Sequence, residues 1–288
     1  MGFNFRRENG GIMISNESGN RTINAHFNPI KHALREGKVC VGVAGLSFPC
    51  PASVQITANA GYSFYYFDME HSGLSISAIE HICTAAKIAG ITPIGGSSGI
   101  ADYLISRLLD NGAMGVIAPH VNTQQETQIV VNACRYPPKG TRGFVGLGAL
   151  TDYQTIDAVK WVEEMNEEIL CAVKVESAQG VDNIERITDV SGLDAVIIGT
   201  ADLSVSMGIP GQSHNPRFQK AIDTLLNVCS KKNIACGPHV NNPEDLKYWA
   251  DKGANFMTCS FDGQLLLEAS KSIMETARKL LGNKMYNT

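Results

Sequence analysis

Short apolar runs alternate with longer amphipathic stretches along most of this chain. The runs have the length of strands, and their nearly continuous apolar character is typical of parallel strands that are buried on both faces. They lie at residues 39–45 (VCVGVAG), 64–69 (FYYFDM), 91–96 (ITPIGG), 114–119 (MGVIAP), 169–176 (ILCAVKVE), 193–199 (LDAVIIG), 234–239 (IACGPH) and 255–260 (NFMTCS).

Between and after these runs, apolar residues recur at the spacing of helices. The helical patterns cover residues 29–36, 76–89, 101–111, 124–135, 157–167, 180–189, 216–231, 243–251 and 262–281. Alternating strands and helices predict a parallel sheet with right-handed crossovers, and eight repeats is the number that closes a TIM (β/α)8 barrel.

The length of 288 residues and the apolar content of 44% allow one large core, so we expect a single barrel domain over residues 28–288. Residues 1–27 are rich in Asn, Gly, Ser and Arg without periodicity, which predicts a flexible N-terminal extension or an arm that docks on a partner subunit. A Rossmann oxidoreductase is disfavoured because no strand is followed by the glycine-rich dinucleotide fingerprint.

Charge and cysteine content restrict the partners. The net charge is −4 and no basic cluster is present, so we expect a small anionic substrate and no nucleic acid. No run has transmembrane length and the N-terminus lacks a signal-peptide pattern, which predicts no membrane association. The eight cysteines form no CxxC pair and lie mostly in apolar patterns, which is typical of free, buried thiols in a cytoplasmic protein.

Titratable groups follow most of the predicted strands. In a β/α barrel such groups gather at one rim, where the chemistry of these folds takes place. Glu176 and Asp202 follow consecutive strands, and we interpret them as a pair of metal ligands. Taken alone, Asp202 is better explained as a helix cap, and the second carboxylate on the neighbouring strand is what favours a ligand pair. The other groups at this rim are Asp68, Glu70, His71, His120, His239 and Asp262.

Two carboxylates favour a hard divalent ion such as Mg²⁺ or Mn²⁺, with Co²⁺ as a further candidate. Positions left open on the ion suit a chelating 2-oxo acid, whose enolate the ion would stabilise as a Lewis acid. His71 is a candidate to move the proton, and its alternative is a core or cap histidine. Gly199, Thr200 and Ala201 lead into a short helix, and their amides are candidates to hold the substrate carboxylate.

Five segments, in order, resemble the HpcH/HpaI family of class II, metal-dependent pyruvate aldolases, typified by 4-hydroxy-2-oxoheptanedioate aldolase and 2-dehydro-3-deoxyglucarate aldolase. They are FDMEHSGLS (67–75), LLDNGAMGVIAP (108–119), RYPPKGTRG (135–143), VKVESAQGVDNIERI (173–187) and GTADLSVSMG (199–208). The resemblance runs from about residue 28 to the C-terminus.

The resemblance implies a barrel of the phosphoenolpyruvate/pyruvate type, with a divalent metal on Glu176 and Asp202 and the pyruvate carboxylate on the amides of residues 199–201. It also implies that His71 acts as acid and base through metal-bound water, with Asp68 close by. Asp110 would reach this histidine from a neighbouring subunit. We therefore expect a homo-oligomer, a hexamer or trimer of dimers, that exchanges its last helix between subunits.

Three positions depart from the family. Gly96 stands where these aldolases carry an arginine that contacts the substrate ketone, and its loss is expected to lower ordinary aldol activity on the order of a hundredfold. Lys174 replaces a glutamine, and we interpret it as a counter-ion for nearby carboxylates; the alternatives are a compensating cation or a Schiff-base nucleophile. His120 replaces a methionine. Together the three indicate a remodelled substrate pocket.

The first functional prediction is a metal-dependent carbon–carbon lyase or synthase that forms an enolate from pyruvate or oxaloacetate and joins it to, or releases it from, an aldehyde or thioester. Within the same fold, the alternative is a siderophore-type citrate synthase or an oxaloacetate decarboxylase that forms a carbon–carbon bond. The alternative from another class is a noncatalytic barrel that binds a 2-oxo acid.

Overall fold

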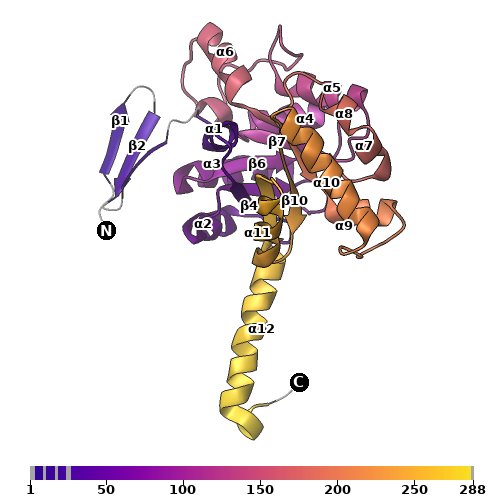
Figure 1. Cartoon of the computed structure of the whole chain (residues 1–288). Helices are drawn as coiled ribbons and strands as arrows, with labels where there is room; N and C mark the ends of the chain where they lie inside the picture. Colours follow the sequence, from indigo (N-terminus) through magenta and orange to yellow (C-terminus); the bar gives the residue numbers. More distant parts are fainter. Residues whose placement is uncertain (1–3, 9–10, 17–18, 24–26, 287–288) are drawn as a thin grey trace.

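Eight parallel strands close into a barrel in the computed structural model, which describes residues 4–8, 11–16, 19–23 and 27–286 (Figure 1). Around the barrel the strands follow their order in the chain, and the last one pairs with the first. The strands are β4 (Cys40–Gly45), β5 (Phe64–Asp68), β6 (Thr92–Gly96), β7 (Gly115–Ala118), β8 (Leu170–Val175), β9 (Ala195–Ile198), β10 (Ala235–Val240) and β11 (Phe256–Phe261). The closed sheet confirms the TIM-type barrel, and each of its strands overlaps one predicted run, with β10 and β11 ending one residue later than predicted.

Helices connect the strands and cover the outside of the barrel. They are α1 (Pro29–Arg35), α2 (Pro51–Ala60), α3 (Ile76–Ala89), α4 (Asp102–Asp110), α5 (Gln124–Cys134), α6 (Ala158–Glu168), α7 (Ala178–Asp182), α8 (Ile184–Ile187), α9 (Thr200–Ser206), α10 (Pro216–Lys231), α11 (Pro243–Asp251) and α12 (Asp262–Leu281), with 3-10 turns at Ala149–Thr151 and Gly282–Lys284. The helix predicted over 180–189 is divided at Asn183, which ends α7 and begins α8.

Helix α2 was not predicted, and its sequence explains why. Its segment PASVQITANA buries only Ser53, Val54 and Thr57, so no broad apolar stripe marks it in the sequence. The helix is instead set by its ends. Pro51 occupies the first turn, and the Ser53 hydroxyl accepts a hydrogen bond from the backbone N–H of Cys50 at 3.1 Å.

The barrel interior is filled at the end where the strands begin. Phe64 and Phe256 stack there with ring centroids 4.9 Å apart, and Gly42 leaves room for the Phe64 ring. Ile30 of α1 packs against the same cluster, so α1 closes this end of the barrel. Because one end is filled in this way, the space for a ligand lies at the opposite end, beside the carboxyl ends of the strands.

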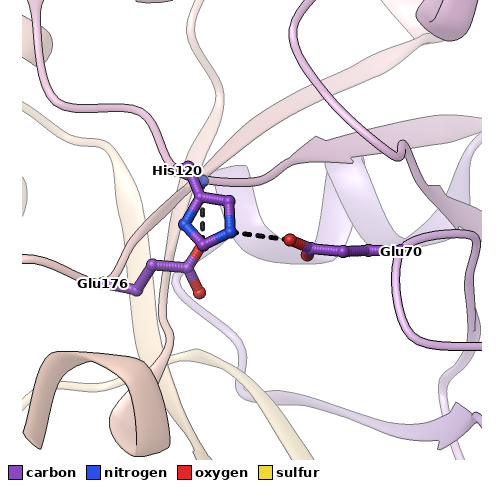
Figure 2. A group of neighbouring side chains, drawn as sticks. All are labelled: Glu70, His120 and Glu176. Carbon is purple, nitrogen blue, oxygen red and sulfur yellow. Dashed lines mark hydrogen bonds and ion pairs between the residues drawn. The ribbon is translucent and has the colours of Figure 1, made fainter. Parts of the chain in front are cut away.

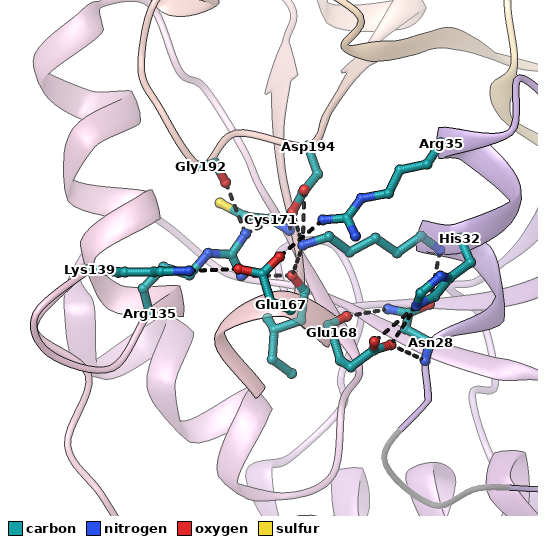
Figure 3. A network of polar contacts seen from close by, with 12 residues as sticks. Asn28, His32, Arg35, Arg135, Lys139, Glu167, Glu168, Cys171, Gly192 and Asp194 are labelled. Carbon is teal, nitrogen blue, oxygen red and sulfur yellow. Dashed lines mark hydrogen bonds and ion pairs between the residues drawn. The ribbon is translucent and has the colours of Figure 1, made fainter. Parts of the chain in front are cut away.

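A polar network joins α1 to the outer loops at the closed end (Figure 3). The buried Lys31 ammonium donates to the Ile169 carbonyl and to Asp194, each at 2.9 Å. Arg135 donates to the same two groups, at 2.7 and 2.8 Å. Burial lowers the pKa of Lys31 below its ordinary value, although Asp194 opposes that change. This network is structural, because it lies at the end of the barrel away from the predicted site.

Two segments lie outside the barrel. β1 (Asn4–Glu8), β2 (Gly11–Asn16) and β3 (Gly19–Ile23) form a small antiparallel sheet in the segment to which we assigned no strands, where residues of low strand propensity hid the pattern. Helix α12 projects away from the barrel (Figure 1). Flexibility of residues 1–27, their docking on a partner and exchange of α12 remain predictions.

The cysteines agree with the expectation of free thiols. All eight are unpaired, seven of them are buried, and Cys50 is partly buried. A search of the described residues finds no helix that combines the length and apolar character needed to cross a bilayer.

Candidate active site

A cavity of about 580 Å³ opens at the carboxyl ends of the barrel strands. Most of the predicted site residues line it, and so do several that were not predicted. The predicted lining residues are Asp68, His71, Lys174, Glu176, Gly199, Thr200, Ala201 and Asp202. The additional ones include Tyr66, His239 and Thr258, whereas His120, Gly96 and Asp110 do not line the cavity itself. Tyr66 and Thr258 lie within β5 and β11, so a search for polar groups that follow the strands could not find them.

Glu176 follows β8 and its carboxylate is buried, with 3% of the residue exposed. The His120 backbone N–H donates to Glu176 Oε1 at 2.7 Å. Burial raises the pKa of Glu176 above its ordinary value, Lys174 and His120 oppose that change, and the charge of Asp202 adds to it. Glu176 and Asp202 both line the cavity, and their pairing as ligands of one metal ion stays a prediction.

Gly199 allows the chain after β9 to pass close to Glu176. A Cβ atom at residue 199 would lie 2.4 Å from Glu176 Oε2 and 2.7 Å from Glu176 Cβ. The chain then enters α9, which carries Asp202 in its first turn, with its side chain exposed. A close approach therefore explains this glycine, whose φ of −76° is open to any residue.

His120 lies between two carboxylates, Glu70 and Glu176 (Figure 2). Its Nε2 atom is 2.6 Å from Glu70 Oε1 and its Nδ1 atom is 3.0 Å from Glu176 Oε1. The ligand atoms of these three residues all lie within 4.8 Å of one another, so they too could hold a metal ion. The contacts of His120 with the two carboxylates depend on its left-handed backbone conformation, in which φ is 55°. No local sequence pattern predicts this conformation.

Asp68 organises the loop that carries Glu70 and His71. Its Oδ1 atom accepts the backbone N–H of Glu70 at 2.6 Å and that of His71 at 3.0 Å, and Ser72 Oγ donates to the Asp68 carbonyl. The His71 side chain is 53% exposed, and its Nε2 atom is 3.5 Å from Glu70 Oε2. Asp68 thus positions the loop, and His71 faces the cavity with its ring free to meet a substrate.

Lys174 lies two residues before Glu176 and points to the same side of β8. Its Nζ atom is 3.7 Å from Glu70 Oε2 and 5.8 Å from the centre of the Tyr66 ring. Burial lowers the pKa of Lys174, but Tyr66 and the carboxylates of Glu176, Asp68 and Glu70 together raise it above its ordinary value. The amine therefore stays protonated, which disfavours the Schiff-base alternative.

His239 lines the same cavity from β10, and its Nδ1 atom is 2.8 Å from Thr258 Oγ1 of β11. Burial lowers the pKa of His239, a hydrogen bond with Asn241 opposes this, and the Lys174 charge adds to it. The ring is therefore neutral at neutral pH. It was noticed in the sequence as a strand-end group but was not assigned a role.

Gly96 ends β6 behind the Tyr66 ring. A Cβ atom at residue 96 would lie 2.4 Å from the Tyr66 hydroxyl, so Tyr66 occupies the space that a side chain there would need. The Tyr66 hydroxyl in turn donates to Asp68 Oδ2 at 3.2 Å. The absence of a side chain at residue 96 is therefore matched by an aromatic residue on the neighbouring strand.

Asp110 lies at the end of α4 and forms an ion pair with Arg142 of the long loop between α5 and α6. The distance from Arg142 Nη2 to Asp110 Oδ1 is 2.7 Å. The Arg142 side chain is fully buried, while that of Asp110 is 35% exposed. Within one chain Asp110 is not among the cavity residues. Its expected approach to His71 of a neighbouring subunit stays a prediction.

Comparison with known proteins matches residues 49–269 to the family model for HpcH/HpaI aldolase/citrate lyase. A 4-hydroxy-4-methyl-2-oxoglutarate aldolase of Chaetomium globosum is 30% identical over 270 residues, covering 91% of this chain and all of the relative. A 2-keto-3-deoxy-L-rhamnonate aldolase of Escherichia coli is 33% identical over 246 residues, covering 84% of this chain and 90% of the relative.

Two solved structures are also similar. An HpcH/HpaI aldolase from Desulfitobacterium hafniense superposes with a TM-score of 0.83 at 30% identity, covering 88% of this chain and 97% of the other. The citrate synthase SbnG superposes with a TM-score of 0.78 at 29% identity, covering 86% and 97%. The similarity thus extends over nearly all of the barrel.

Proposed function

This chain belongs to the HpcH/HpaI aldolase/citrate lyase family, and we propose from its site that it is a metal-dependent carbon–carbon lyase or synthase acting on a 2-oxo acid. The observation that carries the proposal is a buried carboxylate, Glu176, beside Asp202 at the catalytic end of the barrel. Pyruvate and oxaloacetate are the proposed 2-oxo acids, with an aldehyde or a thioester as the second substrate.

The residues present fit a divalent cation. Glu176 is buried, and the nearby Asp202 charge makes its ionisation less favourable, a cost that a cation would offset. Glu70 Oε2 is a buried acceptor without a hydrogen bond among the described residues. We propose Glu176 and Asp202 as the ligands of Mg²⁺ or Mn²⁺, with Co²⁺ as a further candidate. When bound, the ion supplies Lewis-acid polarisation of the substrate carbonyl.

The protein groups then bind the substrate and move its proton. The Gly199 backbone N–H, predicted as a further donor, already donates to the Val175 carbonyl at 3.1 Å. The backbone amides of Thr200 and Ala201 are therefore the proposed donors to the substrate carboxylate. His71 is the proposed acid and base for the carbon beside the ketone, because its ring faces the cavity. Asp68 positions His71 through the hydrogen bond that its carboxylate accepts from the His71 backbone.

A synthase that condenses oxaloacetate with a thioester is the second candidate. The similarity to the citrate synthase SbnG supports it, and Gly96, which has no side chain where the resemblance implies an arginine, agrees with it. In a citrate-type condensation the methyl group of the thioester loses the proton and its enolate adds to the ketone carbon of oxaloacetate, so this candidate predicts exchange at the thioester methyl. Aldol cleavage or condensation predicts exchange at C3 of the 2-oxo acid, and a noncatalytic binding barrel predicts neither.

We also propose that the chain forms a homo-oligomer. Helix α12 carries large apolar side chains that are exposed in the single chain, which is typical of an interaction surface. They are Leu266, Leu267, Ile273, Met274, Leu280 and Leu281. Exchange of this helix between subunits would cover them, and the hexamer or trimer of dimers implied by the family is the expected assembly.

Hydrogen exchange tests the proposed function without knowledge of the second substrate. Wild-type protein in deuterated water with Mn²⁺ or Mg²⁺ should exchange the C3 protons of pyruvate or oxaloacetate, as followed by NMR. EDTA and Glu176→Gln should abolish exchange, whereas Glu163→Gln, an exposed site on α6, should not change it. Binding of the 2-oxo acid with no exchange at C3, and none at the methyl group of an acetyl thioester added with oxaloacetate, would contradict the proposal and support the noncatalytic alternative.

A further inference from the structure

The ammonium group of Lys174 faces the cavity and forms an ion pair with the carboxylate of Glu70. The residue is 9% exposed and lines the cavity from β8. Glu70 Oε2 lies 3.7 Å from its Nζ atom, which is longer than a hydrogen bond. Among the described residues that line this cavity, Lys174 is the one lysine or arginine. It is therefore the permanent cation that a substrate in this cavity would meet.

The neighbouring acids take their hydrogen bonds from other groups. Asp68 accepts two backbone N–H groups and the Tyr66 hydroxyl. Glu176 accepts the His120 backbone N–H, and Glu70 Oε1 lies 2.6 Å from His120 Nε2. These donors satisfy Asp68 and Glu176, whereas Glu70 Oε2 accepts no hydrogen bond among the described residues and is paired with the Lys174 charge at 3.7 Å. One such ion pair does not use all three N–H groups of Lys174, so one of them can meet a substrate.

Tyr66 determines where the lysine can lie. Its hydroxyl occupies the space beside Gly96, and its ring centre lies 5.8 Å from Lys174 Nζ. The cavity wall formed by β5 and β6 thus carries the Tyr66 ring, and no cationic side chain is present at Gly96. The arrangement keeps the Lys174 ammonium beside the ring, on the same side of β8 as Glu176.

Resting on the proposed function, we propose that Lys174 is a catalytic residue that donates a hydrogen bond to the ketone oxygen of the 2-oxo acid. As the C3 proton leaves to the base, the C–H electron pair forms the C2–C3 double bond and the ketone oxygen gains negative charge. A fixed ammonium near that oxygen stabilises the enolate more than the neutral ketone, which is the condition for catalysis. No electron transfer or further reactant is needed.

Oxalate tests this contact because it resembles the planar, anionic enolate of pyruvate and does not react. Lys174→Met, Lys174→Arg and the exposed control Lys220→Met are compared with the wild type. The measurements are Mn²⁺ affinity, oxalate affinity of the Mn²⁺-loaded protein, and the rate of C3 exchange. Thermal unfolding of each variant verifies that it folds.

We expect Lys174→Met to lower the exchange kcat on the order of a hundredfold and to weaken oxalate binding, with Mn²⁺ affinity retained. Lys174→Arg should retain part of the exchange rate and part of the oxalate affinity, and Lys220→Met should behave as the wild type. The proposal is overturned if Lys174→Met shows a normal C3 exchange rate and normal oxalate affinity. It is also overturned if the lower exchange rate and oxalate affinity are fully explained by weaker Mn²⁺ binding, which is the result expected if Lys174 serves only as a counter-ion for the carboxylates. A borohydride-trapped pyruvate adduct on Lys174 would also overturn it.

Failure of the proposed function gives a different result. A wild-type protein that shows no exchange, yet binds oxalate in a manner that depends on Lys174, would contradict the enzymatic proposal while supporting the oxygen contact. Normal wild-type exchange that is insensitive to Lys174 would contradict this inference alone.

Discussion

Glu176 shows at the scale of one residue how burial prepares a binding group. Water would favour its ionised form, but the site removes that water and places a second carboxylate nearby. The carboxylate keeps two close contacts, both with His120: its backbone N–H at 2.7 Å and its ring Nδ1 atom at 3.0 Å. A buried carboxylate of this kind binds a cation strongly, because the positive charge offsets the cost of burial and the repulsion from the second carboxylate.

The raised pKa of Glu176 predicts a particular dependence of stability on pH. The relevant pH window lies between 4.5, the ordinary pKa of a glutamate, and the higher pKa of Glu176 in the folded protein. In this window Glu176 is protonated to a greater extent in the folded protein than in the unfolded chain. The Glu176 contribution to the free energy of unfolding therefore falls as pH rises through that window. Urea unfolding in EDTA should show this fall in the wild type and a smaller one in Glu176→Gln.

The exposed Glu163→Gln variant is the control for that experiment and should follow the wild type. An equal slope in the Glu176→Gln variant would mean that burial does not oppose ionisation of Glu176.

The sequence could predict most of these residues because they directly follow strands. Glu176, Asp202 and His71 reach the same cavity for that reason. It could not predict the contact of His120 with Glu70, which are 50 residues apart and meet through a left-handed backbone at His120. The filling of the space beside Gly96 was equally hidden, because it depends on the register between two strands.

At the scale of elements, the strands and the amphipathic helices were predictable because burial leaves a period in the sequence. β8 is buried along its whole length, and its apolar run marked it. Helix α2 was missed because three short or small side chains make its buried face. A helix that is stabilised by its capping residues and by contacts of small side chains shows no periodic pattern of large apolar residues in its sequence.

The contact between β5 and β6 predicts the effect of a change at Gly96. Gly96→Ala would place a Cβ atom 2.4 Å from the Tyr66 hydroxyl, so we expect a loss of about 1–3 kcal/mol of stability from overpacking. Tyr66→Leu should relieve this clash, so the cost of Gly96→Ala should be smaller in that background, as measured by a double-mutant cycle in urea. Equal costs in both backgrounds would contradict this packing.

The ion pair between α4 and the long loop predicts an order of stabilities. Asp110→Asn leaves the fully buried Arg142 without its charged partner, whereas Arg142→Met leaves a carboxylate that is 35% exposed and can meet water. We therefore expect Asp110→Asn to lower the free energy of unfolding more than Arg142→Met, with costs of about 1–5 kcal/mol. Urea unfolding measures both, and the reverse order would contradict this account.

At the scale of the whole molecule, the barrel separates stability from chemistry. Lys31, Arg135 and Asp194 hold the closed end, while the titratable groups of the cavity lie at the other end. Helix α12 and its exposed apolar side chains extend beyond the barrel (Figure 1). Their exposure in a single chain predicts that the working molecule contains more than one copy.

A charged substitution on α12 tests that prediction. Ile273 is 68% exposed, and Ile273→Lys should lower the molar mass measured by size-exclusion chromatography with light scattering, because a lysine would be buried at the interface. Ser272→Lys, on an adjacent exposed position, is the control for added charge. A monomeric wild type would contradict the proposed assembly.

The most direct measurement is a crystal structure of the protein grown with Mn²⁺ and oxalate, with anomalous data to locate the ion. The account predicts an anomalous peak about 2.0–2.6 Å from a carboxylate oxygen of both Glu176 and Asp202, with oxalate completing the coordination. A peak held by Glu70 and His120 without Asp202, or no peak near Glu176, would contradict it.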